Sequence, residues 1–148
     1  MRIIIHDLLE DMWKNLGLEV DEKDVVVSKD NITSIGSKLG KCRQLVLISR
    51  CVYGGFSPFV QNALEELRTD FEPFLELRHG QTHYEIKKKN KSNFSMICCF
   101  YGDDIKPSEE KNARILSVSD GISLQAKGVK ILFYNNIEEI SQINTVLI

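Results

Sequence analysis

Short apolar runs alternate with amphipathic segments along most of the chain, and this alternation indicates the fold class. The apolar runs predict strands that are buried on both faces, as in parallel sheets. The predicted strands cover residues 2–6, 24–28, 45–48, 95–101 and 128–134. The intervening segments have helical spacing, at residues 8–16, 31–39, 58–68, 107–125 and 137–143. Strands joined by helices predict a doubly wound, parallel α/β sheet with right-handed crossovers.

One segment interrupts this alternation between the third predicted helix and the fourth predicted strand. Residues 71–93 form a connection about twice the usual length. Their apolar and aromatic residues fall in two short runs around Gly80, which predict an extra β-hairpin before the fourth strand. The lysine-rich residues 87–91 resemble a nucleic-acid patch in isolation. At the end of a hairpin they more often form a solvated turn that discourages strand aggregation.

The most informative stretch is residues 45–67, where an apolar strand leads through a glycine loop into a helix. Gly54 and Gly55 permit a positive φ and the close approach of another group. Ser57 is a predicted N-cap and Pro58 a predicted first helical residue, so the helix starts where the loop ends. In an open parallel sheet, such a loop forms one wall of a ligand crevice beyond the carboxyl ends of the strands.

This stretch resembles the third strand and following loop of flavodoxin-like proteins, especially the NAD(P)H-dependent FMN reductases. In that family an apolar strand ends in Ser-Pro-Val-Tyr-x-Gly-Gly or a close variant, and this chain has Ser-Arg-Cys-Val-Tyr-Gly-Gly at residues 49–55. The resemblance implies one flavodoxin-like domain over residues 1–148, a three-layer sandwich whose five-stranded parallel sheet has the order 2-1-3-4-5. It also implies FMN as cofactor and NAD(P)H as electron donor.

The resemblance places the flavin ring against two loops. The implied contacts are Ser49, Arg50, Cys51, Val52, Tyr53, Gly54, Gly55 and Phe56 after the third strand, and Tyr101 and Gly102 after the fourth. Backbone amides around Tyr53 would face the polar edge of the ring, and Tyr53 would pack against it. Arg50, where many relatives have proline, would stabilise negative charge on the pyrimidine edge by charge-assisted hydrogen bonding. The alternative is that the glycines serve a tight turn and Tyr53 covers the sheet edge.

The loop after the first strand lacks the features of a phosphate site. FMN-binding relatives have a turn rich in Ser, Thr, Gly and Asn, which holds the phosphate at the helix N-terminus. This chain has His6-Asp7-Leu8-Leu9-Glu10-Asp11 instead. Asp7 and Glu10 have the spacing of a capping box, which predicts that the helix satisfies its own free amides. His6 is predicted to bond to the backbone rather than to carry protons.

Charge repulsion also argues against phosphate at this loop. A helix terminus favours an exposed anion by roughly 0.3–1 kcal/mol. Two like charges about 4 Å apart repel by ~4 kcal/mol at an effective dielectric constant near 20. Because three carboxylates follow the strand, repulsion exceeds the gain, and the sequence predicts no ordinary FMN phosphate site here.

Composition argues against several other classes of function. A formal charge of −2 and a pI near 5.9 give no electrostatic case for nucleic acid or an anionic membrane. No apolar run approaches the ~20 residues of a transmembrane helix, and a cytoplasmic location is expected. The four cysteines contain no C-x-x-C pair, which predicts free thiols, with Cys98 and Cys99 on opposite faces of a strand. Asp103 and Asp104 lack the spaced ligands of a cation cage, so no metal site is predicted.

Two functions from different classes fit these features. The first is a flavoprotein of the FMN reductase type, which passes electrons from NAD(P)H through a flavin, or a protein that binds another planar small molecule. The second is a degenerate flavodoxin-like domain without cofactor that acts through protein contacts. Its predicted interface is the hairpin at residues 74–89, with a homodimer as one arrangement. The glycine loop favours the first function, and the acidic loop favours the second.

Overall fold

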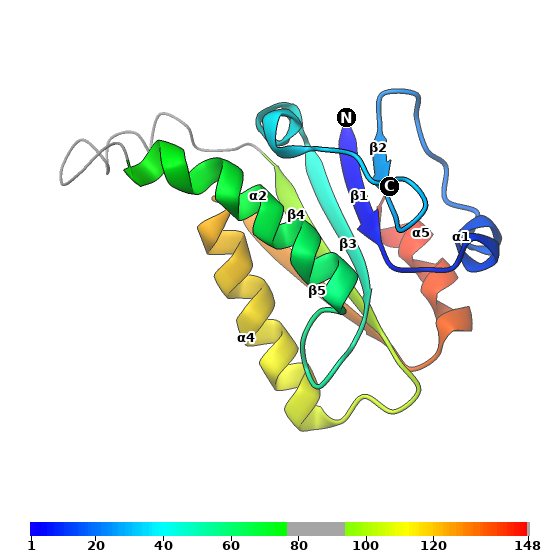
Figure 1. The fold of residues 1–148 in the computed structure, drawn as a ribbon. Helices are drawn as coiled ribbons and strands as arrows, with labels where there is room; N and C mark the ends of the chain where they lie inside the picture. Colours follow the sequence, from blue (N-terminus) through cyan, green and yellow to red (C-terminus); the bar gives the residue numbers. More distant parts are fainter. Residues whose placement is uncertain (77–93, 148) are drawn as a thin grey trace.

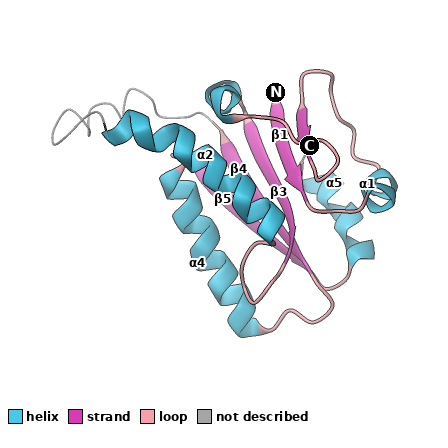
Figure 2. Ribbon diagram, viewed as in Figure 1, coloured by secondary structure: helices cyan, strands magenta, loops and turns pink. Residues whose placement is uncertain are grey.

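A computed structural model describes residues 1–76 and 94–147 of the chain. Within these residues, five parallel strands form one sheet in the order β2-β1-β3-β4-β5, which confirms the predicted order (Figures 1 and 2). The strands are β1 (Arg2–His6), β2 (Val25–Val27), β3 (Gln44–Arg50), β4 (Ser95–Tyr101) and β5 (Gly128–Tyr134). In the paired register, Ile5 lies opposite Val27 on one side and Leu47 on the other.

Helices cover both faces of the sheet and give the predicted three layers (Figure 1). On one face, α2 (Pro58–Glu76) and α4 (Pro107–Ser123) lie side by side. The short 3-10 helix η1 (Gly36–Lys41) packs beside α2. On the other face lie α1 (Glu10–Leu16), the 3-10 helix η2 (Ile137–Gln142) and α5 (Ile143–Val146). Within residues 1–76 and 94–147, no helix is long and apolar enough to span a bilayer.

Each face of the sheet buries its own apolar core, because both faces are covered by helices. Ile3 and Ile5 pack on the side of α2 and α4, whereas Ile4 packs on the side of α1 and α5. All three side chains are fully buried. Cys98 belongs to the first core and Cys99 to the second, so the prediction that they point to opposite faces is confirmed.

Several predicted helices differ in the structure. The one predicted at residues 137–143 forms the 3-10 helix Ile137–Gln142, followed by the short α5. The first helix begins at Glu10 rather than at residue 8. Residues 31–39 contain no α-helix, and only the 3-10 helix Gly36–Lys41 forms there, because two glycines disfavour a longer helix. Helix α2 continues past residue 68 to Glu76, so residues 74–76, expected in the hairpin, are helical. The rest of the predicted hairpin lies outside the described residues.

The predicted side-chain cap of α2 is also wrong. Pro58 is the first helical residue, as predicted, and Ser57 immediately precedes it. The Ser57 carbonyl accepts the first helical hydrogen bond from the Gln61 amide at 2.8 Å. Its hydroxyl oxygen, however, is buried and has no hydrogen-bond partner among the described residues.

Candidate functional site

A crevice lies beyond the carboxyl ends of the central strands. In Figure 1 the loops that follow β3 and β4 are at the lower edge of the sheet, away from both termini. The crevice has a volume of about 620 Å³, within the range of small-molecule sites. Its apolar lining comes from Leu9, Met12, Val52, Phe59 and Ile137. It lies beside β1 and β3, where the strand order reverses, which is the usual ligand position in open α/β sheets.

Asp7 joins the three loops that border the crevice. One carboxylate oxygen accepts the Arg50 backbone amide at 2.8 Å, and the other accepts the Tyr101 hydroxyl at 2.6 Å. The Asp7 amide itself donates to the Ile48 carbonyl at 3.2 Å. Burial, followed by the hydrogen bond to Asp7, raises the pKa of Tyr101, so this phenol stays protonated and donates.

These contacts overturn the predicted capping box. The N-cap of α1 is Leu9, and no side-chain hydrogen bond caps this helix. Asp7 is engaged by β3 and β4 instead of by α1, because those long-range donors meet both of its oxygens. The first turn of α1 nevertheless contains Glu10 and Asp11, so the expected negative charge stands at that helix end.

His6 is a structural residue at the end of β1. Its Nδ1 accepts the Leu8 amide at 3.1 Å, and its ring stacks on Trp13 with a centroid distance of 4.2 Å. The side chain is buried, and this burial lowers the pKa of His6 to about 4. The prediction that His6 bonds to the backbone is confirmed.

Four of the predicted contact residues line the crevice together: Arg50, Val52, Tyr101 and Gly102. They come from the two loops that the sequence singled out. Arg50 is exposed, and its guanidinium forms no ion pair within the described part of the chain. Val52 adds an apolar wall, and the Gly102 amide donates to the Tyr134 carbonyl at 3.1 Å.

Three further predicted residues support the loop from behind the crevice lining. The Ser49 hydroxyl oxygen accepts the Ser57 amide at 2.8 Å, and the Cys51 amide donates to the Tyr101 carbonyl at 2.8 Å. Phe56 is buried and stacks on Phe100 in the core. Burial raises the pKa of the Cys51 thiol, which disfavours the reactive thiolate.

The tip of the loop points away from the crevice lining. Gly54 has a φ of 80°, and a Cβ there would lie 2.9 Å from the Cβ of Asn112 in α4. Tyr53 also has a positive φ, 51°, and is 93% exposed. Gly55 pairs with Val52 through two backbone hydrogen bonds of 3.0 and 2.9 Å. The group that closely approaches the glycines is therefore the N-terminal half of α4.

The crevice is lined by positive as well as negative side chains, whereas the sequence indicated mainly negative charge near it. Lys29 and Arg50 line it together with Asp7 and Asp103. Sequence reasoning missed Lys29, although it follows β2, whose carboxyl end lies at the same sheet edge. Met12, Phe59 and Ile137 were also missed as lining residues, although the helices that contain them begin at this edge of the sheet. Among the described residues, no three His, Cys, Asp or Glu side chains could jointly hold a metal ion.

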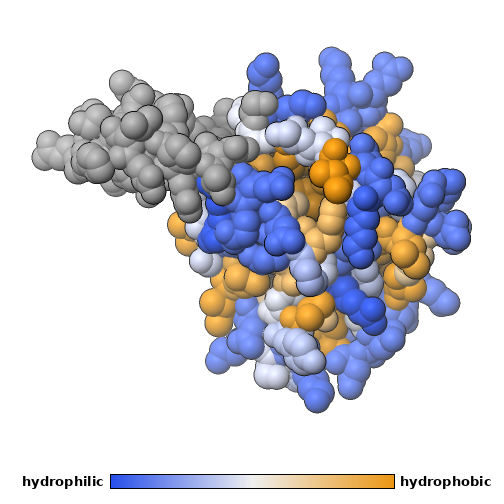
Figure 3. Space-filling model, viewed as in Figure 1, coloured by the Kyte–Doolittle hydropathy of each residue, from blue (hydrophilic) through white to orange (hydrophobic). Residues whose placement is uncertain are grey.

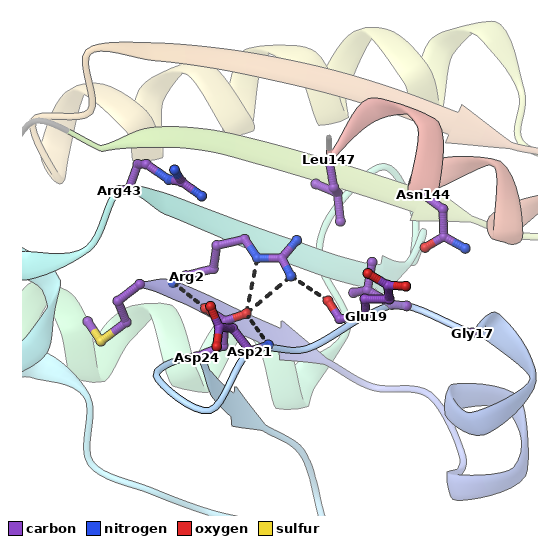
Figure 4. Close-up of a pocket in the computed structure, with 10 residues that line it drawn as sticks. Arg2, Gly17, Glu19, Asp21, Asp24, Arg43, Asn144 and Leu147 are labelled. Carbon is purple, nitrogen blue, oxygen red and sulfur yellow. Dashed lines mark hydrogen bonds and ion pairs between the residues drawn. The ribbon is translucent and has the colours of Figure 1, made fainter.

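A second cavity of about 580 Å³ opens at the amino ends of the strands (Figure 4). Two of its polar side chains, Arg2 and Asp24, satisfy each other. The Arg2 guanidinium donates to Asp24 at 3.1 and 3.2 Å and to the Glu19 carbonyl at 2.6 Å, as Figure 4 shows. These bonds tie β1 to the segment that leads into β2. Because these bonds occupy the Arg2 guanidinium, we interpret this cavity as a structural contact between β1 and the segment before β2 rather than as a ligand site.

Comparison with known proteins identifies the fold. No protein-family model matches the sequence, and no curated protein sequence matches it. A solved structure of the Trp repressor binding protein from Bacillus subtilis aligns with a TM-score of 0.60 and 11% identity, covering 97% of this chain and 96% of that one. General stress protein 14 from Treponema denticola, solved in complex with FMN, aligns with a TM-score of 0.56 and 9% identity, covering 99% and 96%. The chain has a flavodoxin-like fold.

Proposed function

We propose that this chain is a flavin-binding protein of the NAD(P)H-dependent FMN reductase type, with the ring held in the crevice at the carboxyl edge. The position of the crevice at the reversal of strand order is the observation that carries the proposal. The FMN complex of a structural neighbour supports flavin as the ligand. A bound flavin would supply electron-transfer chemistry, while the chain would bind and orient it.

The apolar walls suit a planar ring. Leu9 and Met12 come from the α1 side, and Val52 and Phe59 come from the β3–α2 side. Leu9 is 69% exposed and occupies an N-cap position, where Ser, Thr, Asp or Asn would stabilise the helix better. An exposed leucine at such a position is consistent with selection for ligand contact rather than for helix stability.

Two polar groups would orient the ring. The Arg50 guanidinium is free to donate to the pyrimidine edge, because no carboxylate of the described residues pairs with it. Tyr101 is fixed by Asp7, so its aromatic face is held at one position in the crevice. In this proposal Arg50, Val52, Tyr101 and Gly102 contact the flavin, and Ser49, Cys51 and Phe56 hold the loop. Gly54 and Gly55 serve the packing of the loop on α4, and the exposed Tyr53 lies outside the proposed contacts.

Titration with riboflavin and FMN, followed by flavin fluorescence and visible absorbance, tests this function. The proposal predicts saturable binding of both. Leu9→Ser should weaken riboflavin binding about fivefold through lost apolar contact, while the control Ile32→Ser, at an exposed residue outside the crevice, should leave it unchanged. Once binding is established, flavin-dependent oxidation of NADPH would be measured to test the reductase activity. No binding of riboflavin, FMN or FAD would overturn the proposal.

One observation favours the second candidate, a cofactor-free domain that acts through protein contacts. Ile115, Val118 and Ile122 form an exposed apolar stripe on the outer side of α4. Hydrophobic residues otherwise form separate spots on the face that carries α2 and α4 (Figure 3). A second copy of the chain packed on this stripe would give concentration-dependent dimers by analytical ultracentrifugation. Val118→Glu would abolish them, and a monomer at all concentrations would contradict this candidate.

A further inference from the structure

Two carboxylates, Asp7 and Asp103, line the crevice. Each oxygen of Asp7 accepts one hydrogen bond, from the Arg50 amide and from the Tyr101 hydroxyl. A carboxylate has about four acceptor positions, so Asp7 can accept further hydrogen bonds but can donate none. Asp103 is exposed and forms no ion pair within the described residues. The hydroxyl groups of a polyol can donate to such a lining, whereas a phosphate monoester is itself negatively charged and an acceptor.

The start of α1 adds negative charge beside the same crevice. Leu9 lines the crevice, and the next two residues, Glu10 and Asp11, belong to the first turn of the helix. Glu10 is in an ion pair with Lys14 at 3.3 Å. Asp11 is exposed and has no ion pair in the described part of the chain, so its charge is not offset in this way. A phosphate near Leu9 would therefore be repelled.

The start of α2 offers few donors to an anion. The Ser57 amide already donates to the Ser49 hydroxyl oxygen at 2.8 Å. Pro58 has no N–H, and Val60 is fully buried. The Phe59 amide is then the donor that this helix end could present to the crevice. Phosphate sites at helix ends use several backbone amides, so α2 does not supply one.

The cations of the crevice do not reverse this balance. Arg50 is assigned to the pyrimidine edge of the ring in the proposed function. Lys29 also lines the crevice, but it is exposed and is followed by an exposed carboxylate, Asp30. Water and salt screen the attraction between such an exposed lysine and an anion. The side chain of a bound flavin would thus meet acceptors and negative charge more than positive charge.

We propose that the crevice is selective for a flavin with an uncharged polyol side chain, of the riboflavin class, and discriminates against the phosphate of FMN. Asp7 and Asp103 accept hydrogen bonds from the hydroxyl groups, and the charges of Asp103 and Asp11 repel a phosphate. The inference rests on the proposed function. It implies that the flavin is held by its ring and its polyol, without a phosphate anchor.

Titrations with riboflavin and with FMN at low ionic strength, followed by flavin fluorescence, test this selectivity. Riboflavin should bind about fivefold more tightly than FMN. The ratio should approach one as sodium chloride is raised to about 0.5 M, because salt screens the repulsion. If FMN binds as tightly as riboflavin at low salt, or more tightly, the inference is overturned and the proposed function stands. If neither flavin binds, the proposed function fails and the inference fails with it.

Two neighbouring aspartates provide a matched pair of variants. Asp103→Asn removes a charge from the lining but keeps an acceptor oxygen, so the affinity for FMN should rise about threefold while that for riboflavin stays unchanged. Asp104→Asn is the control, because Asp104 is also exposed and the change in net charge is the same, but Asp104 is not a lining residue. It should leave the ratio of the two affinities nearly unchanged. Equal effects of the two variants on FMN, or an equal gain for both flavins in Asp103→Asn, would overturn the inference.

Discussion

At the scale of single residues, Asp7 organises the site. It lies directly after β1, and its two oxygens accept hydrogen bonds from the last residues of β3 and β4. Hydrogen bonds to a charged group are stronger than neutral ones, and here they fix the relative positions of two crevice walls. Asp7 is therefore expected to contribute to stability as well as to the shape of the crevice.

Replacing Tyr101 with Phe removes one of these bonds and keeps the ring. We expect the free energy of unfolding to fall by about 1.5 kcal/mol, because a hydrogen bond to a carboxylate is lost. Urea denaturation followed by Trp13 fluorescence measures the change. Tyr53→Phe is the control, because Tyr53 is 93% exposed, and should shift stability by less than about 0.5 kcal/mol. Equal effects of the two substitutions would contradict the role assigned to the Asp7–Tyr101 bond.

His6 predicts a pH dependence of stability. Its folded pKa, about 4, lies below its ordinary value of 6.5, because burial disfavours the charged ring. The unfolded chain binds the proton more tightly, so stability is complete above pH 6.5 and falls as the pH drops toward 4. Between pH 7 and pH 5 the loss attributable to His6 is roughly 2 kcal/mol.

His6→Asn isolates this contribution, because the amide oxygen can accept the Leu8 amide but does not titrate. The variant should be less stable at pH 7, where stacking on Trp13 is lost, but its stability should decline less steeply toward pH 5. Urea denaturation at several pH values gives both curves. Parallel curves would show that His6 does not cause the decline.

At the scale of elements, the close approach of α4 to β5 depends on a single glycine. A Cβ on Gly121 would lie 2.3 Å from Cγ2 of Val129, closer than real contacts allow. Gly121→Ala would gain up to about 1 kcal/mol of helix propensity, but overpacking costs about 1–3 kcal/mol. We expect a net loss of about 1–2 kcal/mol in the free energy of unfolding, measured by urea denaturation.

A second substitution checks the cause of this loss. Gly121→Ala combined with Val129→Ala should be less destabilised than the sum of the two single variants, because the clash is removed. Gly40→Ala is a control, since nothing lies within 4 Å of the Cβ it would add. Strict additivity of the pair would show that the contact with Val129 is not limiting.

Some elements could be predicted from the sequence and others could not. The strands could be predicted, because runs such as Leu45–Ile48 are buried on both faces of the sheet. Such strands consist of consecutive apolar residues, which are visible in the sequence itself. The start of α1 could not be predicted, because Asp7 accepts hydrogen bonds from residues 43 and 94 positions away and does not form the local capping box. Local spacing contains no information about such donors.

At the scale of the whole molecule, the strand order came from a family resemblance, and the structure confirms it. That order decides which loops meet, so four lining residues, Arg50, Val52, Tyr101 and Gly102, could be predicted from the loops after β3 and β4. Lys29 and Ile137 could not, because their positions depend on how the flanking strands and helices pack. The orientation of the Tyr53–Gly55 tip also depends on α4, which lies more than fifty residues further along the chain.

The central claim is that the carboxyl-edge crevice, rather than the cavity at the amino edge, holds a flavin ring. Adding riboflavin to ¹⁵N-labelled protein and following the amide resonances tests it most directly. We predict saturable shifts at Arg50, Val52 and Gly102, with little change at Arg2 and Arg43. Shifts confined to Arg2 and Arg43, or none at any residue, would contradict the account.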